Sequence, residues 1–237
     1  MRTAQEVLAE VKKAVTPQVS DLFLMTTECY DKEAFLGVVK AVRQTISPQM
    51  RLVVNTGDFD STYAKKLREN GATGAYHIVR LREGTDTDIP VKRREETLEA
   101  IASAGLDLYY CVEPIGKEHT YGEIADEILR AQRLKVKYMA VMRRVGVCGT
   151  RKQDAGEITS RELAKIAAVA MLAVRPPVSM NVHEVNPAAM LAGINQLYAE
   201  YGVNPRDTAA ETSRGRGYST EECVKLLSEN GWEVPCL

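Results

Sequence analysis

Residues 75–90 read AYHIVRLREGTDTDIP, and this stretch holds the pattern that decides the fold. It begins as an aromatic and β-branched run, which is typical of a buried strand, and ends in Arg80, Arg82 and Glu83 before a glycine turn. Strand alternation puts the two arginines on one side and Glu83 on the other, so we expect the turn at Gly84 to re-aim one of them. Charges that end an apolar strand need water, a partner or a ligand.

The same unit recurs along the chain, because apolar strand-like segments alternate with segments of helical periodicity. Near-continuous apolar strands separated by helices are typical of a parallel sheet covered by helices. No G-x-G-x-x-G or G-x-x-x-x-G-K motif follows a strand, which favours a (βα) barrel over a nucleotide-binding doubly wound sheet. We expect strands at residues 21–28, 51–58, 75–83, 106–113, 136–144 and 178–184, with a weaker one at 195–200.

Polar residues stand at the C-terminal end of nearly every expected strand. In a barrel these ends form one mouth, where the active sites of this architecture lie. Converging arginines and carboxylates suit a zwitterionic ligand that also carries hydroxyl groups. The residues expected at this mouth are Glu28, Asn55, Asp58, Arg80, Arg82, Glu83, Glu113, Arg143, Arg144, His183 and Glu184.

Arg94 lies on the apolar stripe of the helix expected at residues 90–104, one turn before Leu98. A charge on that face needs a partner. Two interpretations stand level. One is an internal salt bridge, for instance to Glu83 or Glu113, and the other is a grip on the carboxylate of a ligand.

Composition excludes several classes of function. The 31 basic and 32 acidic residues are interspersed and give a net charge of −1, so there is no electrostatic footprint for nucleic acid or for a membrane surface. No apolar run reaches the roughly 18 residues of a membrane span, and the N-terminus lacks a signal-peptide core. We expect a cytoplasmic protein with a small-molecule substrate and no nucleic-acid or membrane partner.

The cysteines give no metal signature and no disulfide framework. They are an odd number with no pair closer than a dozen residues, which excludes a CxxC knuckle. A metal at His183 and Glu184 would need a third ligand from elsewhere, so no metal site is predicted. His119 is expected to be an exposed loop residue. The five cysteines are Cys29, Cys111, Cys148, Cys223 and Cys236.

In order, GATGAYHIVRLREGTD, YYCVEPIGKEHT, RRVGVCGT and the tail GVNPRDT…GRGYS resemble the biotin-synthase-like branch of the radical S-adenosylmethionine enzymes. That branch includes biotin synthase, the hydrogenase-maturation radical enzyme and relatives linked to iron-guanylylpyridinol cofactor synthesis. The resemblance covers essentially the whole chain. It implies S-adenosylmethionine as cofactor, its cleavage to a 5′-deoxyadenosyl radical, and a cofactor precursor as substrate. It also implies that residues 1–175 form the radical-SAM-like part of a barrel and residues 176–237 its biotin and thiamin synthesis-associated part.

The resemblance implies roles for several strand-end residues. Glu28, in a Thr-Thr-Glu that replaces the family's Gly-Gly-Glu, matches the contact to the methionine amino group. The polar strand end that holds ribose and carboxylate matches Arg80, Arg82 and Glu83. Arg94 falls at the place of the arginine for the methionine carboxylate. The turn beside adenine matches Val112, Ile115 and Gly116. We assign Arg143 to the same cofactor site, and the substrate site to Asn55, Glu113, His183 and Glu184.

One departure from the family outweighs the others. Its chemistry needs a Cys-x3-Cys-x2-Cys loop that holds a four-iron cluster, and this chain has no such loop. The segment RTAQEVL resembles the part of the family that begins just after the loop. The predicted fold is therefore a parallel (βα) TIM-type barrel that is incomplete or open at its missing first strand, and the bare chain is expected to be inactive in radical chemistry.

Several explanations and functions remain open at this point. The chain is a fragment, has lost the loop, or receives it from a separate subunit. A homodimer is also open as the oligomeric state. The leading function is the catalytic barrel portion of a radical enzyme, and the alternative is a clusterless protein that binds S-adenosylmethionine or a nucleoside. An unrelated barrel lyase of the aldolase kind ranks last, because no expected strand ends in a lysine poised for a Schiff base.

Overall fold

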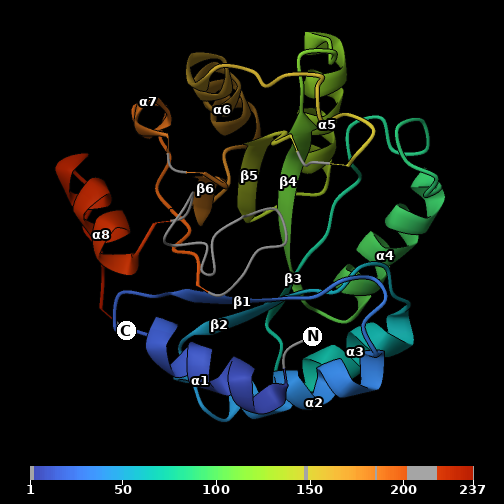
Figure 1. Ribbon diagram of the computed structural model, residues 1–237, viewed down its shortest axis with the longest axis vertical. Coiled ribbons are helices and arrows are strands. Elements are labelled where there is room, and N and C mark those ends of the chain that lie inside the picture. The colour runs from blue at the N-terminus through green and yellow to red at the C-terminus, as the bar shows by residue number, and fades with distance from the viewer. Residues whose placement is uncertain (1–2, 147–148, 185, 202–217, 237) are drawn as a thin grey trace. The chain divides into compact units, whose positions relative to one another are not determined.

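The computed structural model describes residues 3–146, 149–184, 186–201 and 218–236, and in these residues six strands form one sheet in the order β1-β2-β3-β4-β5-β6 (Figure 1). Parallel strands alternate with helices, so the fold is an incomplete α/β barrel of the TIM type, which confirms the predicted fold class. The strands are β1 (Asp21–Met25), β2 (Arg51–Asn55), β3 (Gly74–Tyr76), β4 (Asp107–Ile115), β5 (Tyr138–Arg143) and β6 (Ser179–Val182). The helices are α1 (Ala4–Ala14), α2 (Lys32–Arg43), α3 (Ser61–Glu69), α4 (Val91–Ser103), α5 (Tyr121–Arg133), α6 (Ser160–Val174), α7 (Pro187–Met190) and α8 (Thr220–Glu229).

The chain divides into two compact units. Unit 1 comprises Met1–His77, Ile89–Tyr109 and Val234–Leu237, and unit 2 comprises Ile78–Asp88 and Tyr110–Glu233. Strand β4 contributes its first residues to unit 1 and the rest to unit 2. This division differs from the one expected at residue 175, which concerns family regions and stays a prediction.

Unit 1 is built on the parallel pairing of β1, β2, β3 and the start of β4. Leu22 pairs with Leu52, and Val54 pairs with Ala75. Helices α1, α2 and α3 lie together on one side of β1 and β2 (Figure 1). The core between them includes Val39, which is fully buried. Burying a valine or leucine side chain of this kind contributes about 1.5–3 kcal/mol.

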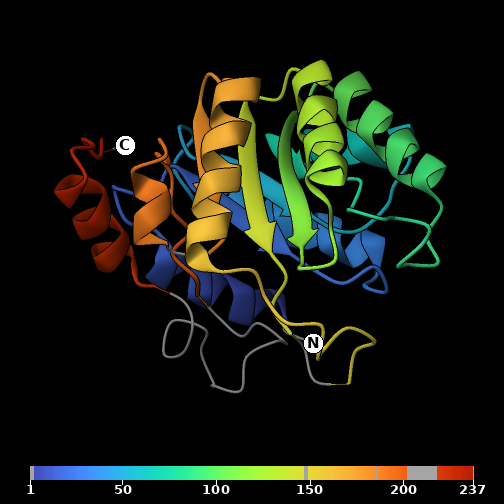
Figure 2. The ribbon, with the colours of Figure 1, turned by 90° about the horizontal axis from the view of Figure 1, so that it is seen from above.

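Unit 2 is built on the later part of β4, on β5 and on β6. Strands β5 and β6 pair in parallel, with Met139 opposite Met180 and Val141 opposite Val182. Helices α5 and α6 lie side by side along these strands (Figure 2). Leu163 of α6 is fully buried against them.

Most helices begin at a capping side chain that can be recognised in the sequence. A capping side chain accepts a hydrogen bond from a backbone N–H that has no partner inside the helix. The pair Thr3 and Glu6 forms the expected reciprocal capping box at α1. Equivalent boxes or single caps are formed by Asp31, Asp60, Thr120 with Glu123, Thr159, and Ser219 with Glu222.

The strand expected at residues 75–83 is wrong beyond Tyr76. β3 ends there, and the chain turns through residues 81–89. The apolar run that follows β3 is buried by packing, with Ile78 and Val79 at 4% and 3% exposure, because burial does not require a strand ladder. The re-aiming also starts earlier than Gly84. Arg82 itself has φ 57°, a left-handed conformation that costs an ordinary residue about 1–2 kcal/mol.

Two further observations concern the rest of the chain. The weak strand expected at residues 195–200 is wrong, since only an isolated bridge joins Gln196 to Asn181. A single bridge cannot build a ladder, and side-chain hydrogen bonds of Asn195 hold this segment to the start of β6 instead. Among the described helices, none is long and apolar enough to cross a membrane.

Candidate functional site

In unit 1, charged groups gather around the carboxylate of Asp58, three residues after β2. Arg94 Nη1 lies 2.8 Å from Asp58 Oδ1, and Arg93 Nε lies 3.0 Å from Oδ2. His77 Nε2 lies 3.4 Å from Oδ1. The backbone N–H of Asp58 donates to Glu28 Oε2 at 2.9 Å, and Arg93 Nη2 lies 2.8 Å from Glu28 Oε1. The side chains of Asp58 and Arg94 are only 4% and 6% exposed, so their charges compensate each other away from water.

This geometry supports the internal-salt-bridge interpretation of Arg94 and shows a partner that the sequence did not suggest. That partner is the carboxylate of Asp58, whereas pairing of Arg94 with Glu83 or Glu113 stays a prediction. The reason is that α4 packs against α3, whose preceding loop carries Asp58. A grip of Arg94 on a ligand carboxylate remains a prediction.

In unit 2, the predicted strand-end charges form ion pairs with one another or with nearby helices. Arg80 Nη1 lies 3.5 Å from Glu83 Oε2, and the Glu83 side chain is fully buried. Arg143 Nη2 donates to Glu184 Oε2 at 3.0 Å. The left-handed Arg82 reaches α5, where its Nε donates to an oxygen of Glu123 at 2.6 Å. This hydrogen bond raises the pKa of Arg82 and offsets part of its backbone strain.

Glu118, on the loop after β4, is the centre of a second group of charges in unit 2. Its carboxylate accepts a hydrogen bond from Arg144 Nη2 at 3.0 Å and another from Lys152 Nζ at 3.1 Å. Lys152 also pairs with Asp86. The bond from Arg144 is the main reason why the pKa of Glu118 falls to about 2.

Glu118→Gln is expected to lower the free energy of unfolding at pH 7, because it removes the stabilising contribution of the ionised Glu118 carboxylate. The parent chain loses the same contribution in acid. A carboxyl whose pKa falls from 4.5 to about 2 on folding stabilises the fold above pH 4.5, and this term disappears as the pH drops toward 2. Because the side chain is partly solvent-exposed, we expect about 1 kcal/mol at pH 7. Urea unfolding at several pH values measures it. The exposed Glu99→Gln is the matched control, and a parent–variant difference that is the same at pH 7 and pH 3 would contradict the assignment.

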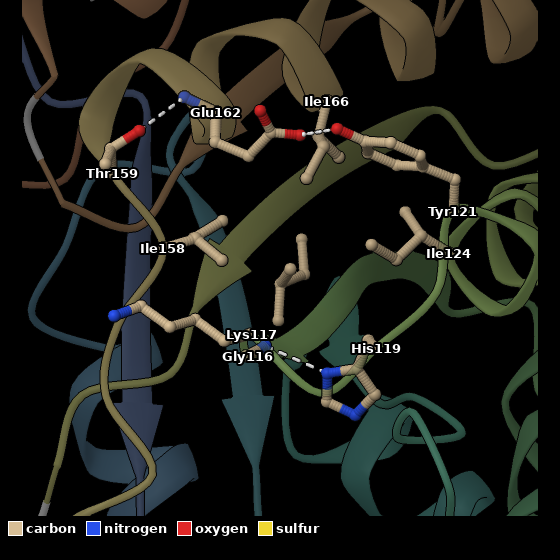
Figure 3. A pocket seen from close by; sticks show the side chains of 10 residues that line it. Gly116, Lys117, His119, Tyr121, Ile124, Ile158, Thr159, Glu162 and Ile166 are labelled. Carbon is tan, nitrogen blue, oxygen red and sulfur yellow. Dashed lines mark hydrogen bonds between the residues drawn. The ribbon is translucent and has the colours of Figure 1, made fainter.

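Unit 2 also contains a cavity of about 420 Å³ between the loop after β4 and the first turns of α5 and α6 (Figure 3). Four isoleucines form its apolar walls, and polar groups from the loop and from both helices complete the lining. Tyr121 Oη donates to Glu162 Oε1 at 2.6 Å across it. The lining residues are Ile115, Gly116, Lys117, His119, Tyr121, Ile124, Ile158, Thr159, Glu162 and Ile166.

His119 is half-buried in this lining, which corrects its expected exposure. Its Nδ1 accepts a hydrogen bond from the backbone N–H of Gly116 at 2.9 Å, because the tight loop folds the ring back over its own backbone. Burial lowers the pKa of His119, so the ring is neutral at pH 7. With Nδ1 accepting, the proton is on Nε2, and this atom has no hydrogen-bond partner in the described part of the chain. His119 therefore has an N–H donor that the described residues leave unused.

The structure brings only some of the predicted site residues together. Ile115 and Gly116 line the cavity, whereas Val112 is fully buried in β4 and does not. Asn55 ends β2 in unit 1. The contributions of Ile158 and Glu162 were missed. The sequence near these two residues contains one recognisable feature, the capping residue Thr159. It predicts where α6 begins but not that a cavity lies beside the helix.

The described cysteines do not fit a four-iron cluster, which needs three thiolates at one place. Cys29 and Cys236 are exposed, while Cys111 and Cys223 are buried in different elements. Among the described residues, each group of side chains with metal-ligand character contains at most one cysteine. Cys148 lies outside the described residues.

No description of a protein family matches the chain. No curated protein matches it either. Several solved structures share its fold, and three illustrate their range. HydG, a maturase of the [FeFe]-hydrogenase, is 19% identical with a TM-score of 0.71 over 98% of this chain and 56% of its own. HydG from Carboxydothermus hydrogenoformans is 15% identical with a TM-score of 0.78 over 98% and 59%. The HMG-CoA lyase from Brucella melitensis is 15% identical with a TM-score of 0.67 over 99% and 85%.

These likenesses establish the fold alone, because at such identities one barrel carries many chemistries. The chain spans a little more than half the length of the HydG chains. Maturases and lyases both share its architecture. The chain thus has a TIM-type α/β barrel fold, which is incomplete in the residues that the structure describes.

Proposed function

We propose that this chain is the barrel portion of a radical S-adenosylmethionine-type enzyme of cofactor biosynthesis, and that its own residues bind the adenosyl ligand in the cavity of unit 2. One observation carries the proposal: Ile115 and Gly116, to which the family resemblance gives the adenine contact, both line that cavity. The fold shared with the HydG maturases supports the barrel.

The chemistry of the lining suits an adenosyl group. A volume of about 420 Å³ lies within the range of small-molecule sites. The isoleucines provide apolar contacts for a base, and the hydroxyl of Tyr121 adds a polar group to the lining. The carboxylate of Glu162 provides an acceptor for a hydroxyl or an ammonium group.

The cofactor and the cluster have to be treated separately. S-adenosylmethionine supplies an adenosyl group that, in the family, a four-iron cluster cleaves to a radical. Because the described cysteines do not fit that cluster, we assign no step of the cleavage to this chain. Its residues bind and orient the ligand and shield it from water. A partner or an additional segment with a Cys-x3-Cys-x2-Cys loop would provide the cluster.

Ile158→Ala is expected to weaken the binding of S-adenosylhomocysteine about tenfold, which corresponds to about 1.4 kcal/mol of lost apolar contact. Calorimetric titration of the parent and the variant measures this change. Leu172→Ala is the matched control. Leu172 lies on α6, which begins two residues after Ile158, but its side chain is 72% exposed and does not line the cavity. Circular dichroism confirms that both variants are folded.

Parallel titrations with S-adenosylmethionine and 5′-deoxyadenosine test which part of the ligand the cavity contacts. All three ligands should lose affinity in Ile158→Ala, since all three carry adenine. Unchanged affinity in that folded variant, or no binding to the parent, would contradict the proposed site. The clusterless alternative makes the same binding prediction. The coding sequence upstream of residue 1 separates the two, because a Cys-x3-Cys-x2-Cys motif there would favour the enzyme.

A further inference from the structure

We propose that unit 2 contains a second site, for a divalent transition metal, held by Cys111, Glu113 and His183. The site goes beyond the proposed function, because none of these residues lines the cavity assigned to the adenosyl ligand. The donor set makes Zn²⁺ the expected ion, since thiolate, imidazole and carboxylate are its usual ligands.

The three side chains converge although they are distant in the sequence. Cys111 and Glu113 are two residues apart on β4 and so share one face of the strand. His183 directly follows β6. The cysteine sulfur, a carboxylate oxygen and an imidazole nitrogen all lie within 4.8 Å of one another. Donors bound to one zinc ion lie about 3–4 Å apart, given bond lengths of about 2.0–2.3 Å, so modest side-chain rotation would complete the site.

At least two of the three ligand side chains are shielded from water. Cys111 is fully buried and Glu113 is 9% exposed. Away from water, the attraction between a dication and a thiolate or carboxylate is stronger than in solvent, because less water screens it. A dication bound to a thiolate and a carboxylate compensates both.

Asn181 provides a second and independent observation. Its side chain is 1% exposed, and within the described residues neither its amide oxygen nor its amide nitrogen has a hydrogen-bond partner. Leaving such a group unsatisfied costs about 1–3 kcal/mol. Asn181 lies on β6, two residues before His183, which directly follows the strand. An unsatisfied buried amide this close to His183 in the chain favours a polar occupant beside it.

Three protein ligands leave the fourth position of a tetrahedral zinc ion open. A water molecule or a substrate oxygen would fill it, and the Asn181 amide offers a donor and an acceptor for such a group. Binding replaces the proton on Cys111 Sγ with the metal ion and releases that proton to solvent. The product is one metal thiolate, with no change of oxidation state.

Other side chains in unit 2 are weaker candidates for metal ligands. Glu184, which the sequence placed beside His183, is bound to Arg143 and is not required. The group formed by Asp86, Glu118 and His119 also brings ligand atoms within 4.8 Å of one another. There, however, Lys152 already bonds both carboxylates, so cationic charge is supplied by the protein itself.

The test uses cobalt as a spectroscopic substitute for zinc. The full chain, stripped of metal with a chelator and kept reduced, is titrated with Co²⁺. We expect one equivalent to produce a thiolate-to-cobalt charge-transfer band together with the visible bands of tetrahedral cobalt, and Zn²⁺ to displace it. Cys111→Ser should abolish the charge-transfer band and weaken Zn²⁺ binding at least a hundredfold. Cys236→Ser, which removes an exposed thiol, is the control and should keep the parent spectrum.

Two further measurements make the result decisive. Zinc titrations in buffers of different ionisation enthalpy should reveal proton release in the parent and less in Cys111→Ser. His183→Gln should weaken Zn²⁺ binding while leaving cysteine available. No thiolate band in the folded parent, or an unchanged band in folded Cys111→Ser, would overturn the proposal without relying on any variant of the adenosyl site.

Discussion

Arg94→Ala should lower the free energy of unfolding by about 3–5 kcal/mol, because it leaves the carboxylate of Asp58 buried without its closest cation. The two side chains are 6% and 4% exposed and their atoms are 2.8 Å apart. Breaking one partner of a buried pair costs far more than the pair itself contributes. Urea unfolding of the parent and the variant, followed by circular dichroism, measures the loss.

Arg93→Ala provides the matched control, since Arg93 contacts the same carboxylate from a side chain that is 55% exposed. We expect a loss of less than about 1 kcal/mol. A double-mutant cycle of Arg94→Ala with Asp58→Ala should give a coupling energy that accounts for most of the Arg94 effect. Equal losses in the Arg93 and Arg94 variants would show that burial does not set the effect. A fully stable Arg94→Ala that binds S-adenosylhomocysteine weakly would restore the ligand-binding interpretation.

Tyr110→Phe should lower the free energy of unfolding by about 2–3 kcal/mol at pH 7. The hydroxyl of Tyr110, on β4, donates to the carboxylate of Glu127 on α5, and Tyr110 is 1% exposed. Removing it takes one donor from the buried Glu127 carboxylate, which keeps the bond from Arg130 Nε at 3.1 Å, and takes the acceptor from the backbone N–H of Val79. Thermal and urea unfolding measure the change.

The matched control is Tyr121→Phe, which deletes the same hydroxyl-to-glutamate bond from a tyrosine that is 60% exposed. It should cost under about 1 kcal/mol, because water replaces the lost partner. Similar losses in the two variants would contradict the role given to burial.

The Tyr110 variant should also show a definite pH dependence. Burial raises the pKa of Glu127, and the bond from Tyr110 opposes that rise. A carboxyl with a raised folded pKa favours folding below its ordinary pKa of 4.5, and this contribution is lost as the pH rises through the folded value. Tyr110→Phe removes the opposing bond, so its destabilisation should increase from pH 4 to pH 7. A loss that is constant over this range would mean that Glu127 does not titrate there.

The sequence by itself determined the alternation of strands and helices, because the interactions that start a helix or bury a strand act between residues close together in the chain. A capping hydroxyl or carboxylate bonds to N–H groups two or three residues away, so Thr3, Thr120 and Ser219 specify helix starts without help from the fold. Apolar runs such as LVV after Arg51 reveal strands that are buried on both faces. Alternation of the two elements then leaves few architectures, and the barrel was among them.

The tertiary structure decided which groups meet. The sequence showed that Arg94 needed a partner, but only packing of α4 against α3 selected Asp58. The apolar run after Tyr76 predicts burial, which the structure shows, but also a strand, which it does not, because a buried chain can turn as well. Cys111 lies on β4 and His183 directly follows β6, with several elements between them, so no spacing rule in the sequence could bring them together. Hydrogen-bonded caps and hydrophobic periodicity act over a few residues, whereas ion pairs, cavities and ligand sets depend on distances that only the folded chain fixes.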